Sequence, residues 1–435
     1  MFLTRRRING RLGRLQGLQE LGAMEMTTIT AEGAGRAAGL RIALFSGNYN
    51  MVRDGANKAL NRLVRYLLAN GAAVRVYSPT IPNPGFEPAG DLVSVPSFSI
   101  PTRREYRLAT GLPKRVQDDI RAFKPNLIHV SAPDLLGRRA QTLARRLDVP
   151  VVASLHTLFQ TYLDYYGLAF LKPLGERYLD RFYGRCDYVL APNEIIADEL
   201  RQSTGLGDRV RIWSRGVDHN LWSGEKRSLE WRRANGYADD EAVILFFGRL
   251  VKEKGLDVFE GTVDALRARG HRVRPLIVGA GPARDDMESR IGEAVFTGHV
   301  EGRELATAVA SADILVNPST TEAFGNVNLE AMASGVALVS ADAPAARALI
   351  EDGRTGLLVS PRDVDAYADA VEALIRDSSR RLAMAAAAVE ASKAYRWSTI
   401  LDRVIDAYRV AVAEGPSRNA PKAKSPILTK TMSAA

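Results

Sequence analysis

Residues 314–335 read ILVNPSTTEAFGNVNLEAMASG. The first six residues are an apolar run with the length of a buried strand, and a helix is expected to begin near Asn326 or Val327. A strand, a polar loop and a helix in this order form the repeating unit of a parallel α/β sheet. Because open α/β sheets bind ligands at the carboxyl ends of their strands, the loop is predicted to be functional.

Two glutamates bracket this loop. Glu322 precedes the helix, and Glu330 lies in its first turns, where side chains lean back toward the amino terminus. The free N–H groups of Gly325 to Val327 suit a diphosphate. Each carboxylate accepts two hydroxyl donors, so we expect Glu322 to bind sugar hydroxyls and Glu330 a ribose. The alternative is a capped helix with a surface glutamate and a solvated loop glutamate.

The same alternation of strands and helices extends from Leu40 to about Val410. A helix over 57–70 is expected to stop at Gly71, and the turn-rich segment 211–224 indicates a hinge. The fold class is therefore α/β, with two Rossmann-like, doubly wound parallel-sheet domains facing a central cleft. Strands are expected at 41–46, 73–78, 126–131, 149–156, 188–193, 242–248, 273–279, 294–298, 314–319, 337–342 and 355–360.

At 435 residues the chain is too long for one ordinary core. We expect an acceptor domain over 40–215 and a nucleotide-sugar type domain over 216–395. A C-terminal helix is expected over 396–414, and one arrangement considered for it is a crossing back to the first domain. Residues 1–39 are interpreted as a disordered or mis-started leader, with Met24 or Met26 as alternative starts, and 415–435 as a disordered tail.

Composition narrows the class of protein. The single cysteine, Cys186, excludes a disulfide framework and a cysteine-based zinc cluster, which suits the cytoplasm. No apolar run approaches the roughly 18 to 20 residues of a membrane-spanning helix. Residues 41–215 contain 25 Lys and Arg against 16 Asp and Glu, whereas residues 216–435 contain 28 against 31. A basic first domain fits an anionic membrane surface or acceptor, with a solvated basic face as the alternative. The sequence contains no RNA-binding signature, so we expect no nucleic-acid partner.

A pair of cations follows the strand at 242–248, in FFGRLVKEKGLD (246–257). Gly248 ends the strand, and Arg249 and Lys254 flank a short loop closed by Gly255. Two cations at a strand's carboxyl edge can neutralise a diphosphate leaving group. The alternative is ordinary loop surface charge.

A glycine turn and an acidic pair complete the second half. In VGAGPARDDM (278–287), Gly279 and Gly281 would permit close approach to a nucleotide, although the spacing departs from a dinucleotide fingerprint. Asp363-Val364-Asp365 has the letters of a metal-binding DXD motif, but it falls where a helix begins. An N-cap is therefore predicted. We expect no metal and no other cofactor.

Candidate residues of the first half lie in two loops. In NYNMVRDGANKAL (48–60), Gly55 allows the loop to lie against a ligand. In SLHTLFQTYLDYYG (154–167), His156 ends a buried strand and faces the cleft, although a lone histidine there also fits a structural role. The aromatic side chains that follow fit either an acceptor pocket or a core stripe. The acceptor-side candidates are Asp54, Asn57, Lys58, Phe159, Tyr162 and Tyr166.

Together these segments resemble retaining glycosyltransferase family four, with the GT-B fold. The resemblance runs from about Arg41 to Tyr408, and its nearest branch contains GDP-mannose-dependent α-mannosyltransferases and sulfoquinovosyl transferases that act on lipid acceptors. The segments that carry it are HTLFQTYLDYYG (156–167), IWSRGVD (212–218), GRLVKEKGLD (248–257), VGAGP (278–282), VFTGHVEGRELA (295–306) and TEAFGNVNLEAMASG (321–335).

The resemblance implies transfer of a hexosyl group from a GDP or UDP sugar to a lipid or saccharide acceptor, with retention and without a metal. It implies that Glu322 binds the donor sugar, Glu330 the ribose, and Arg249 with Lys254 the diphosphate. His156 would lie beside the donor sugar. Backbone contacts would come from Phe324, Gly325, Asn326 and Val327, with Gly55 under the phosphates.

Two loops depart from the family pattern, which often has a glycine pair in each. Ala345 and Ala346 replace one pair, and Arg53 to Ala56 lacks the other. Two other functions were weighed. A catalytically silent scaffold or regulatory subunit has no reason to keep Glu322, Glu330, Arg249 and Lys254 together. A dinucleotide-dependent oxidoreductase is disfavoured because the first strand is not followed by G-x-G-x-x-G.

Overall fold

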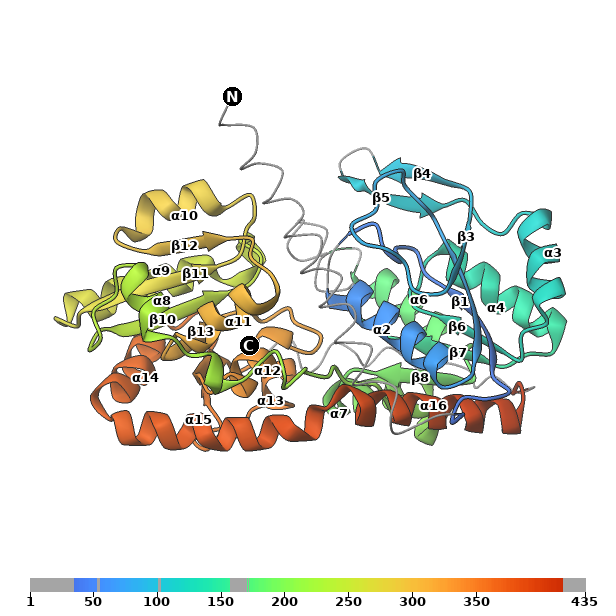
Figure 1. Ribbon diagram of the computed structural model, residues 1–435. Helices are drawn as coiled ribbons and strands as arrows, with labels where there is room; N and C mark the ends of the chain where they lie inside the picture. Colours follow the sequence, from blue (N-terminus) through green and yellow to red (C-terminus); the bar gives the residue numbers. More distant parts are fainter. Residues whose placement is uncertain (1–34, 53–54, 101–102, 157–169, 171, 418–435) are drawn as a thin grey trace, which may run out of the picture. The chain divides into compact units, whose positions relative to one another are not determined.

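The computed structural model describes residues 35–52, 55–100, 103–156, 170 and 172–417. These residues form two parallel sheets flanked by helices, with one additional hairpin (Figure 1). The elements up to the hinge are, in chain order, β1 Arg41–Phe45, α2 Gly55–Ala69, β2 Ala73–Ser78, β3 Asp91–Ser94, β4 Ser97–Ile100, β5 Arg103–Ala109, α3 Lys114–Phe123, β6 Leu127–Val130, α4 Leu135–Leu147, β7 Val151–Ser154, α6 Lys172–Tyr183, β8 Tyr188–Ala191, α7 Glu194–Thr204 and β9 Val210–Ile212.

The elements after the hinge repeat the strand–helix alternation. They are α8 Leu229–Ala234, β10 Ala242–Phe247, α9 Leu256–Ala268, β11 Val273–Val278, α10 Arg284–Ile291, β12 Val295–Gly298, α11 Gly302–Ala310, β13 Ile314–Asn317, α12 Asn326–Ala333, β14 Ala337–Ala341, α13 Pro344–Arg347, β15 Leu357–Val359, α14 Val364–Arg376, α15 Ser378–Ser392 and α16 Trp397–Glu414.

The first sheet has the strand order β3-β2-β1-β6-β7-β8-β9. Strand β1 pairs in parallel with β2 on one side and with β6 on the other. The chain therefore winds outward from β1 to β3 and then returns to β6, which makes the sheet doubly wound. The two-stranded antiparallel unit β4–β5 is inserted before the return.

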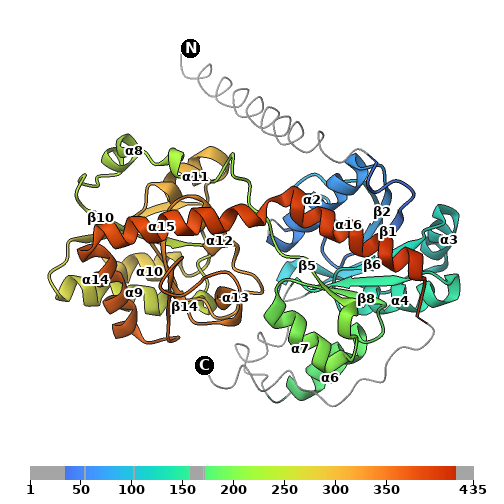
Figure 2. The same ribbon diagram turned by 90° about the horizontal axis from the view of Figure 1, so that it is seen from below.

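The second sheet has the order β12-β11-β10-β13-β14-β15, and all of its recorded strand pairs are parallel. Alternate residues of each strand enter opposite cores. In β10, Leu245 packs in the core with α11, α12 and α15, while Ile244 packs in the core with α9, α10 and α14. Helices α12 and α15 lie side by side in both views (Figure 2). Both faces are covered, which explains the unbroken apolar runs of these strands.

All eleven strands expected from the sequence are present, and the doubly wound α/β class is confirmed. The sequence prediction missed β3, β4, β5 and β9. Strand β3 is only four residues long and has no buried residue, and β9 has three residues at the start of the predicted hinge. Strands as short as β3 and β9 carry too few residues for a detectable period, which does not apply to the seven-residue β5.

The chain divides into two compact units, one running to Val152 and including Ile405–Ser417, the other running from Ala153 to Val404. The described residues begin inside the segment 1–39 that was expected to be a leader. Residues 35–39 already form a turn, in which the N–H of Ala37 donates to the carbonyl of Asn70 (2.9 Å). Residues 1–34 and 418–435 lie outside the described residues. Within the described part of the chain, no helix combines the length and apolar composition that a membrane crossing requires.

A buried polar contact attaches the end of α16 to the first sheet. Tyr408 Oη is hydrogen-bonded to Nδ1 of His129 on β6 (2.7 Å), and both side chains are fully buried. Arg36 and Asp406 add an exposed ion pair (2.9 Å) to the same unit. Burial lowers the pKa of His129 to about 3, because the charged imidazolium would lose its hydration.

The first prediction concerns the pH dependence of stability. An unfolded histidine titrates near 6.5, so below that pH the unfolded chain binds a proton that the folded unit excludes. The free energy of unfolding should therefore fall as the pH drops from about 6.5 toward 3, by about 2 kcal/mol at pH 5 relative to pH 8. Urea titrations at several pH values measure this. His129→Asn keeps a hydrogen-bond partner for Tyr408 but does not titrate, so the free energy of unfolding of this variant should depend less on pH. An identical pH dependence in both proteins would contradict the lowered pKa of His129.

Candidate functional site

The central strands of the second sheet bring two loops together. Strands β10 and β13 are neighbours in the sheet, although the chain visits β11 and β12 between them. This reversal of strand order is where doubly wound sheets bind ligands. The loop after β10 contains Arg249 and Lys254, and the loop after β13 contains Glu322. The sheet topology therefore places the strongest sequence candidates in neighbouring loops.

Gly255 decides how closely these loops approach. It ends the short 3₁₀ helix Lys252–Lys254 in the left-handed region, with φ of 71°. A Cβ at this position would lie 2.8 Å from Cβ of Pro318, the first residue after β13. Only a glycine both adopts this backbone angle and leaves room for the proline. The contact holds the preceding lysine against the second loop.

Lys254 and Glu322 form an ion pair across the two loops. Nζ of Lys254 donates to Oε1 of Glu322. The two side chains are 24% and 23% exposed, so the pair is mostly desolvated and still accessible to a ligand. Charge-assisted hydrogen bonds of this kind are stronger than neutral ones. The structure thus brings together one predicted cation and one predicted hydroxyl acceptor.

Helix α12 begins four residues after Glu322. Gly325 is its N-cap in the left-handed region, with φ of 88°, and Asn326 is its first residue, as the sequence predicted. Phe324 is buried and packs edge-on against Tyr395, which fixes the loop before the cap. Glu330 is half-buried on the same helix. The N–H groups of Asn326 and Val327 in this first turn have no acceptor among the described residues, an arrangement that suits an anion.

Arg249 lies on the same loop as Lys254 but is not part of the ion pair. Its side chain is exposed, and no described residue forms an ion pair or hydrogen bond with its guanidinium. The backbone beside it is anchored, because Gly248 donates to the carbonyl of Val278 (3.0 Å) and Leu250 to that of Ala280 (3.1 Å). The position is fixed while the charged group stays available.

Gly279 and Gly281 lie against a neighbouring loop of the chain. That they also let a nucleotide approach the backbone stays a prediction. In the structure, a Cβ at Gly279 would overlap the carbonyl oxygen of Gly248, and one at Gly281 would overlap that of Leu250. The approaching group is therefore the chain's own loop after β10. These glycines let the segment after β11 pack against the loop after β10, on either side of Arg249.

A buried polar network that the sequence prediction missed supports the loop after β13. Nδ2 of Asn317 donates to Oδ1 of Asn328 (2.8 Å), and Nδ2 of Asn328 donates to Oγ of Ser340 (3.2 Å). Oδ1 of Asn317 accepts from the N–H of Ser319 (3.2 Å). The network joins β13, β14 and α12 beneath the site. Asn328 lies three residues after Gly325 in the predicted helix, so its place on that helix was visible in the sequence. Nothing in the sequence indicated that it pairs with Asn317.

The first-sheet loop places its candidates differently from the sequence expectation. Helix α2 begins at Gly55 itself, not at Asn57, so this glycine is the first helical residue. Asn57 is buried and donates to the carbonyl of Val52 (2.9 Å), which makes it a structural residue of the loop. Lys58 is exposed on α2. The candidates Asp54, Phe159, Tyr162 and Tyr166 lie outside the described residues.

His156 is held by side chains on both ring nitrogens. Nη2 of Arg215 donates to Nδ1 (2.7 Å), and because a guanidinium cannot accept, this nitrogen carries no proton. The proton of the neutral ring is therefore on Nε2, which donates to Oγ of Ser154 (2.8 Å). Trp213 packs edge-on against the ring at 4.9 Å between centroids. Arg215 is only 4% exposed. It belongs to the segment IWSRGVD (212–218), but no role was predicted for it from the sequence.

Asp134 is a further carboxylate that the sequence prediction missed. It follows β6 and caps α4 by accepting from the N–H of Gly137 (2.7 Å). Burial raises its pKa to about 6, against the lowering effect of that hydrogen bond. A Cβ at Gly47, after β1, would overlap Oδ2 of Asp134. The reversal point of the first sheet therefore also has a close contact between two loops.

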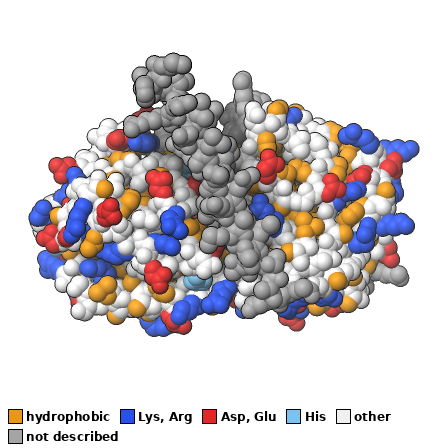
Figure 3. Space-filling model, in the orientation of Figure 1, with side chains coloured by type: hydrophobic (Ala, Val, Ile, Leu, Met, Phe, Trp, Pro, Cys, Tyr) orange, Lys and Arg blue, Asp and Glu red, His pale blue; other side chains and the backbone are white. Residues whose placement is uncertain are grey.

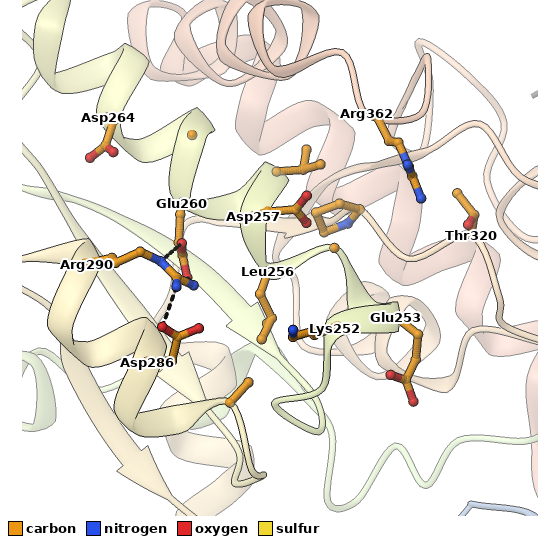
Figure 4. Close-up of a pocket in the computed structure, with 15 residues that line it drawn as sticks. Lys252, Glu253, Leu256, Asp257, Glu260, Asp264, Asp286, Arg290, Thr320 and Arg362 are labelled. Atoms are coloured by element: carbon orange, nitrogen blue, oxygen red, sulfur yellow. Dashed lines mark hydrogen bonds and ion pairs between the residues drawn. The ribbon is translucent and has the colours of Figure 1, made fainter. Parts of the chain in front are cut away.

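A separate cavity of about 650 Å³ opens beside α9 (Figure 4). It shares Gly255 and Pro318 with the loops described above, but Arg249, Lys254, Glu322 and Glu330 do not line it. Figure 4 shows Arg290 between Glu260 and Asp286 on its wall, at 2.8 and 2.6 Å. The carboxylates of its wall make it a poor site for a diphosphate.

The remaining acidic and alanine positions have structural roles. Asp363 is the N-cap of α14 and accepts from the N–H of Ala366 (3.0 Å), so the N-cap prediction is confirmed. Ala345 and Ala346 are buried in α13. No group of three metal-ligating side chains occurs among the described residues.

Basic and acidic side chains are interspersed on the visible face of the unit with the second sheet (Figure 3), so this face has no electrostatic potential of a single sign.

Two family models match the chain. The model described as Glycosyltransferase Family 4 matches residues 53–221, and the one described as Glycosyl transferases group 1 matches residues 241–377. The chain is 30% identical over 382 residues to a GDP-mannose-dependent alpha-mannosyltransferase of Corynebacterium glutamicum, which covers 86% of this chain and 90% of that protein. It is 31% identical over 375 residues to the sulfoquinovosyl transferase of Arabidopsis thaliana, with 84% and 72% covered.

Solved structures share the architecture. Sucrose-phosphate synthase from Thermosynechococcus elongatus superposes with a TM-score of 0.70 at 20% identity, covering 86% of this chain and all of that one. HepE from Anabaena, in complex with UDP and glucose, superposes with a TM-score of 0.64 at 18% identity, covering 85% and 99%. With two doubly wound parallel sheets, these matches establish the GT-B fold.

The second prediction tests the buried amide network. Asn328→Leu removes the acceptor of Asn317 and the donor to Ser340, so the free energy of unfolding should fall by about 1–3 kcal/mol. Asn326→Leu, two residues earlier and only half-buried, should change it by less than about 0.5 kcal/mol. Urea unfolding of both variants measures the difference. Equal losses would show that the network does not support the loop.

Proposed function

The chain belongs to glycosyltransferase family 4, and on this premise we propose that it is a retaining, metal-independent hexosyltransferase. It moves a sugar from a nucleotide diphosphate sugar to a hydroxyl of a lipid or saccharide acceptor and forms an α-glycoside. The observation that carries the proposal is the Lys254–Glu322 ion pair at the reversal point of the second sheet, beside the start of α12. A cation, a hydroxyl acceptor and free N–H groups are the three features that a sugar diphosphate requires.

The donor diphosphate is assigned to the cations and the helix start. The first turn of α12 supplies N–H donors, Lys254 supplies one charge, and the exposed Arg249 supplies another. When the phosphates engage Lys254, Glu322 is released to accept hydrogen bonds from sugar hydroxyls. Glu330, half-buried on α12, is assigned to the ribose. The ion pair thus keeps both groups positioned for the donor.

Bond cleavage depends on stabilising the departing diphosphate. Its negative charge grows as the glycosidic bond to phosphate breaks, and two nearby cations favour that state over the ground state. The acceptor hydroxyl then attacks the anomeric carbon from the side of the leaving group and gives its proton to the departing phosphate oxygen, which preserves the anomeric configuration. This route needs no protein nucleophile. His156, a neutral imidazole oriented by Arg215, is assigned to a position beside the donor sugar.

A GDP sugar is our first choice of donor. Proteins named GDP-mannose-dependent alpha-mannosyltransferase from Corynebacterium glutamicum and two mycobacteria match most of the chain at 29–31% identity. The UDP-bound HepE structures share only 18–19% identity. The sulfoquinovosyl transferase match keeps a second sugar class open to the same experiment. A lipid acceptor and peripheral contact with an anionic membrane complete the proposal.

The third prediction is the direct test of this function. Thermal-shift screening should identify a stabilising nucleotide among GDP, UDP and ADP, and GDP-mannose should release GDP when a lipid acceptor is present. Added EDTA should leave this rate unchanged. Glu322→Ala should lower kcat/KM at least about a hundredfold, because the sugar loses its positioning carboxylate.

Glu253→Ala is the control, since Glu253 lies in the same loop region but lines the other cavity. Its kcat/KM should stay close to that of the unmodified protein. No nucleotide release from any donor across a panel of lipid and saccharide acceptors would contradict the proposed function. Equal effects of the two glutamate substitutions would contradict the role of Glu322.

The fourth prediction separates an enzyme from a catalytically silent scaffold. Arg249→Ala/Lys254→Ala should weaken GDP binding by about thirtyfold or more, because two charge-assisted contacts to the diphosphate are lost. Lys252→Ala removes a lysine from the same 3₁₀ helix, but this exposed side chain lines the other cavity. Its GDP affinity should change by less than about threefold. Calorimetry measures both, and unchanged affinity in the double variant would favour the scaffold.

A further inference from the structure

A second pocket in the first unit has no role in the proposed reaction. Its volume is about 440 Å³, and it lies between α3, α4 and the segment that follows β5. Helices α3 and α4 lie side by side in both ribbon views (Figures 1 and 2). The lining residues are Pro96, Thr110, Gly111, Leu112, Pro113, Gln117, Arg139, Thr142, Leu143 and Arg146. None of them is acidic, in contrast to the cavity beside α9.

Two arginines give this pocket its charge. Arg139 and Arg146 are seven residues apart on α4, which places them on one face of the helix with Thr142 between them. Both are exposed, and neither guanidinium has an ion-pair or hydrogen-bond partner among the described residues. Two unneutralised guanidinium groups that line one pocket without a carboxylate are the chemistry that recognises a phosphate group.

The backbone adds a donor on the opposite wall. Gly111 is buried, has a φ of 129°, and its N–H has no acceptor among the described residues. An ideal Cβ at this glycine would lie 4.0 Å from Cγ of Arg139, so the two sides of the pocket are close together. Buried N–H groups are normally satisfied, and a bound anion would satisfy this one.

An exposed apolar pair lies next to the pocket. Phe98 on β4 and Leu108 on β5 are direct partners in the antiparallel register, and they are 52% and 45% exposed. Pro96 and Thr110, which line the pocket, are each two residues from one member of this pair. The N–H of Thr110 donates to the carbonyl of Pro96 (2.9 Å), so the hairpin continues into the pocket wall. Side chains two residues apart share one face of a strand.

We propose that this pocket binds the phosphate group of an anionic lipid, with Phe98 and Leu108 contacting the acyl region. Basic side chains beside exposed apolar ones are the combination that binds an anionic membrane surface. A free phosphate ester offers the same charge to the arginines but leaves the apolar pair uncovered. The net positive charge of residues 41–215 favours the same partner. This site is separate from the donor loops of the second sheet.

The fifth prediction tests binding without turnover, so it is independent of the donor assignment. Sedimentation with phosphatidylcholine vesicles containing phosphatidylglycerol should capture the protein, and pure phosphatidylcholine vesicles should not. Arg139→Ala/Arg146→Ala should weaken capture about thirtyfold. The matched control is Arg138→Ala/Arg145→Ala, which removes the same charge from exposed residues of the same helix that do not line the pocket. It should weaken capture less than about threefold.

Two further measurements identify the source of the phosphate. Phe98→Ser/Leu108→Ser should lower vesicle capture about tenfold and leave the affinity for glycerol phosphate, measured by calorimetry, unchanged. Circular dichroism melting curves should be alike for all variants. Equal losses in the two arginine pairs would overturn the pocket in favour of diffuse charge, and binding of neither vesicles nor glycerol phosphate would overturn it as well. Binding of glycerol phosphate without vesicle capture would overturn the lipid assignment.

Discussion

The approach of the loop after β10 to the loop after β13 is the constraint on which the candidate site depends. Gly255 lets the chain turn against Pro318, and the turn holds Lys254 on Glu322. A larger residue at Gly255 would separate the loops, and Lys254 would lose its contact with Glu322. A buried amide network under the second loop keeps the other partner in place. Site geometry here follows from backbone packing before any ligand contact.

The first sheet repeats this arrangement at its own reversal point. Strands β1 and β6 are neighbours, as β10 and β13 are in the second sheet. A glycine follows the earlier strand in each case, and it admits a residue from the loop after the later strand. In the first sheet Gly47 admits Asp134, and in the second Gly255 admits Pro318. In both sheets, a glycine without a side chain therefore lets two loops pack closely at the point where ligands bind in this fold class.

His156 and Arg215 show how a charged residue controls a neutral one. The guanidinium must donate, so it assigns the unprotonated nitrogen of the imidazole and thereby its tautomer. Trp213 closes one side of the ring and also contacts the arginine. The histidine is consequently a fixed, polar, uncharged group. This orientation suits a role in positioning a sugar better than one in transferring protons.

The sequence alone determined the strand–helix alternation, eleven of the strands, the start of α12 at Asn326 and the N-cap at Asp363, because these features arise from local periodicity and capping chemistry. It also identified Lys254 and Glu322 as candidates, since motif and residue type are local properties. Only the tertiary structure decided that they pair with each other, because 68 residues separate them along the chain. The same holds for the amide network of Asn328, for the contact of Asp134 with Gly47, and for the contact of Gly279 with Gly248. Packing between distant segments sets these distances, and a linear pattern contains no distances.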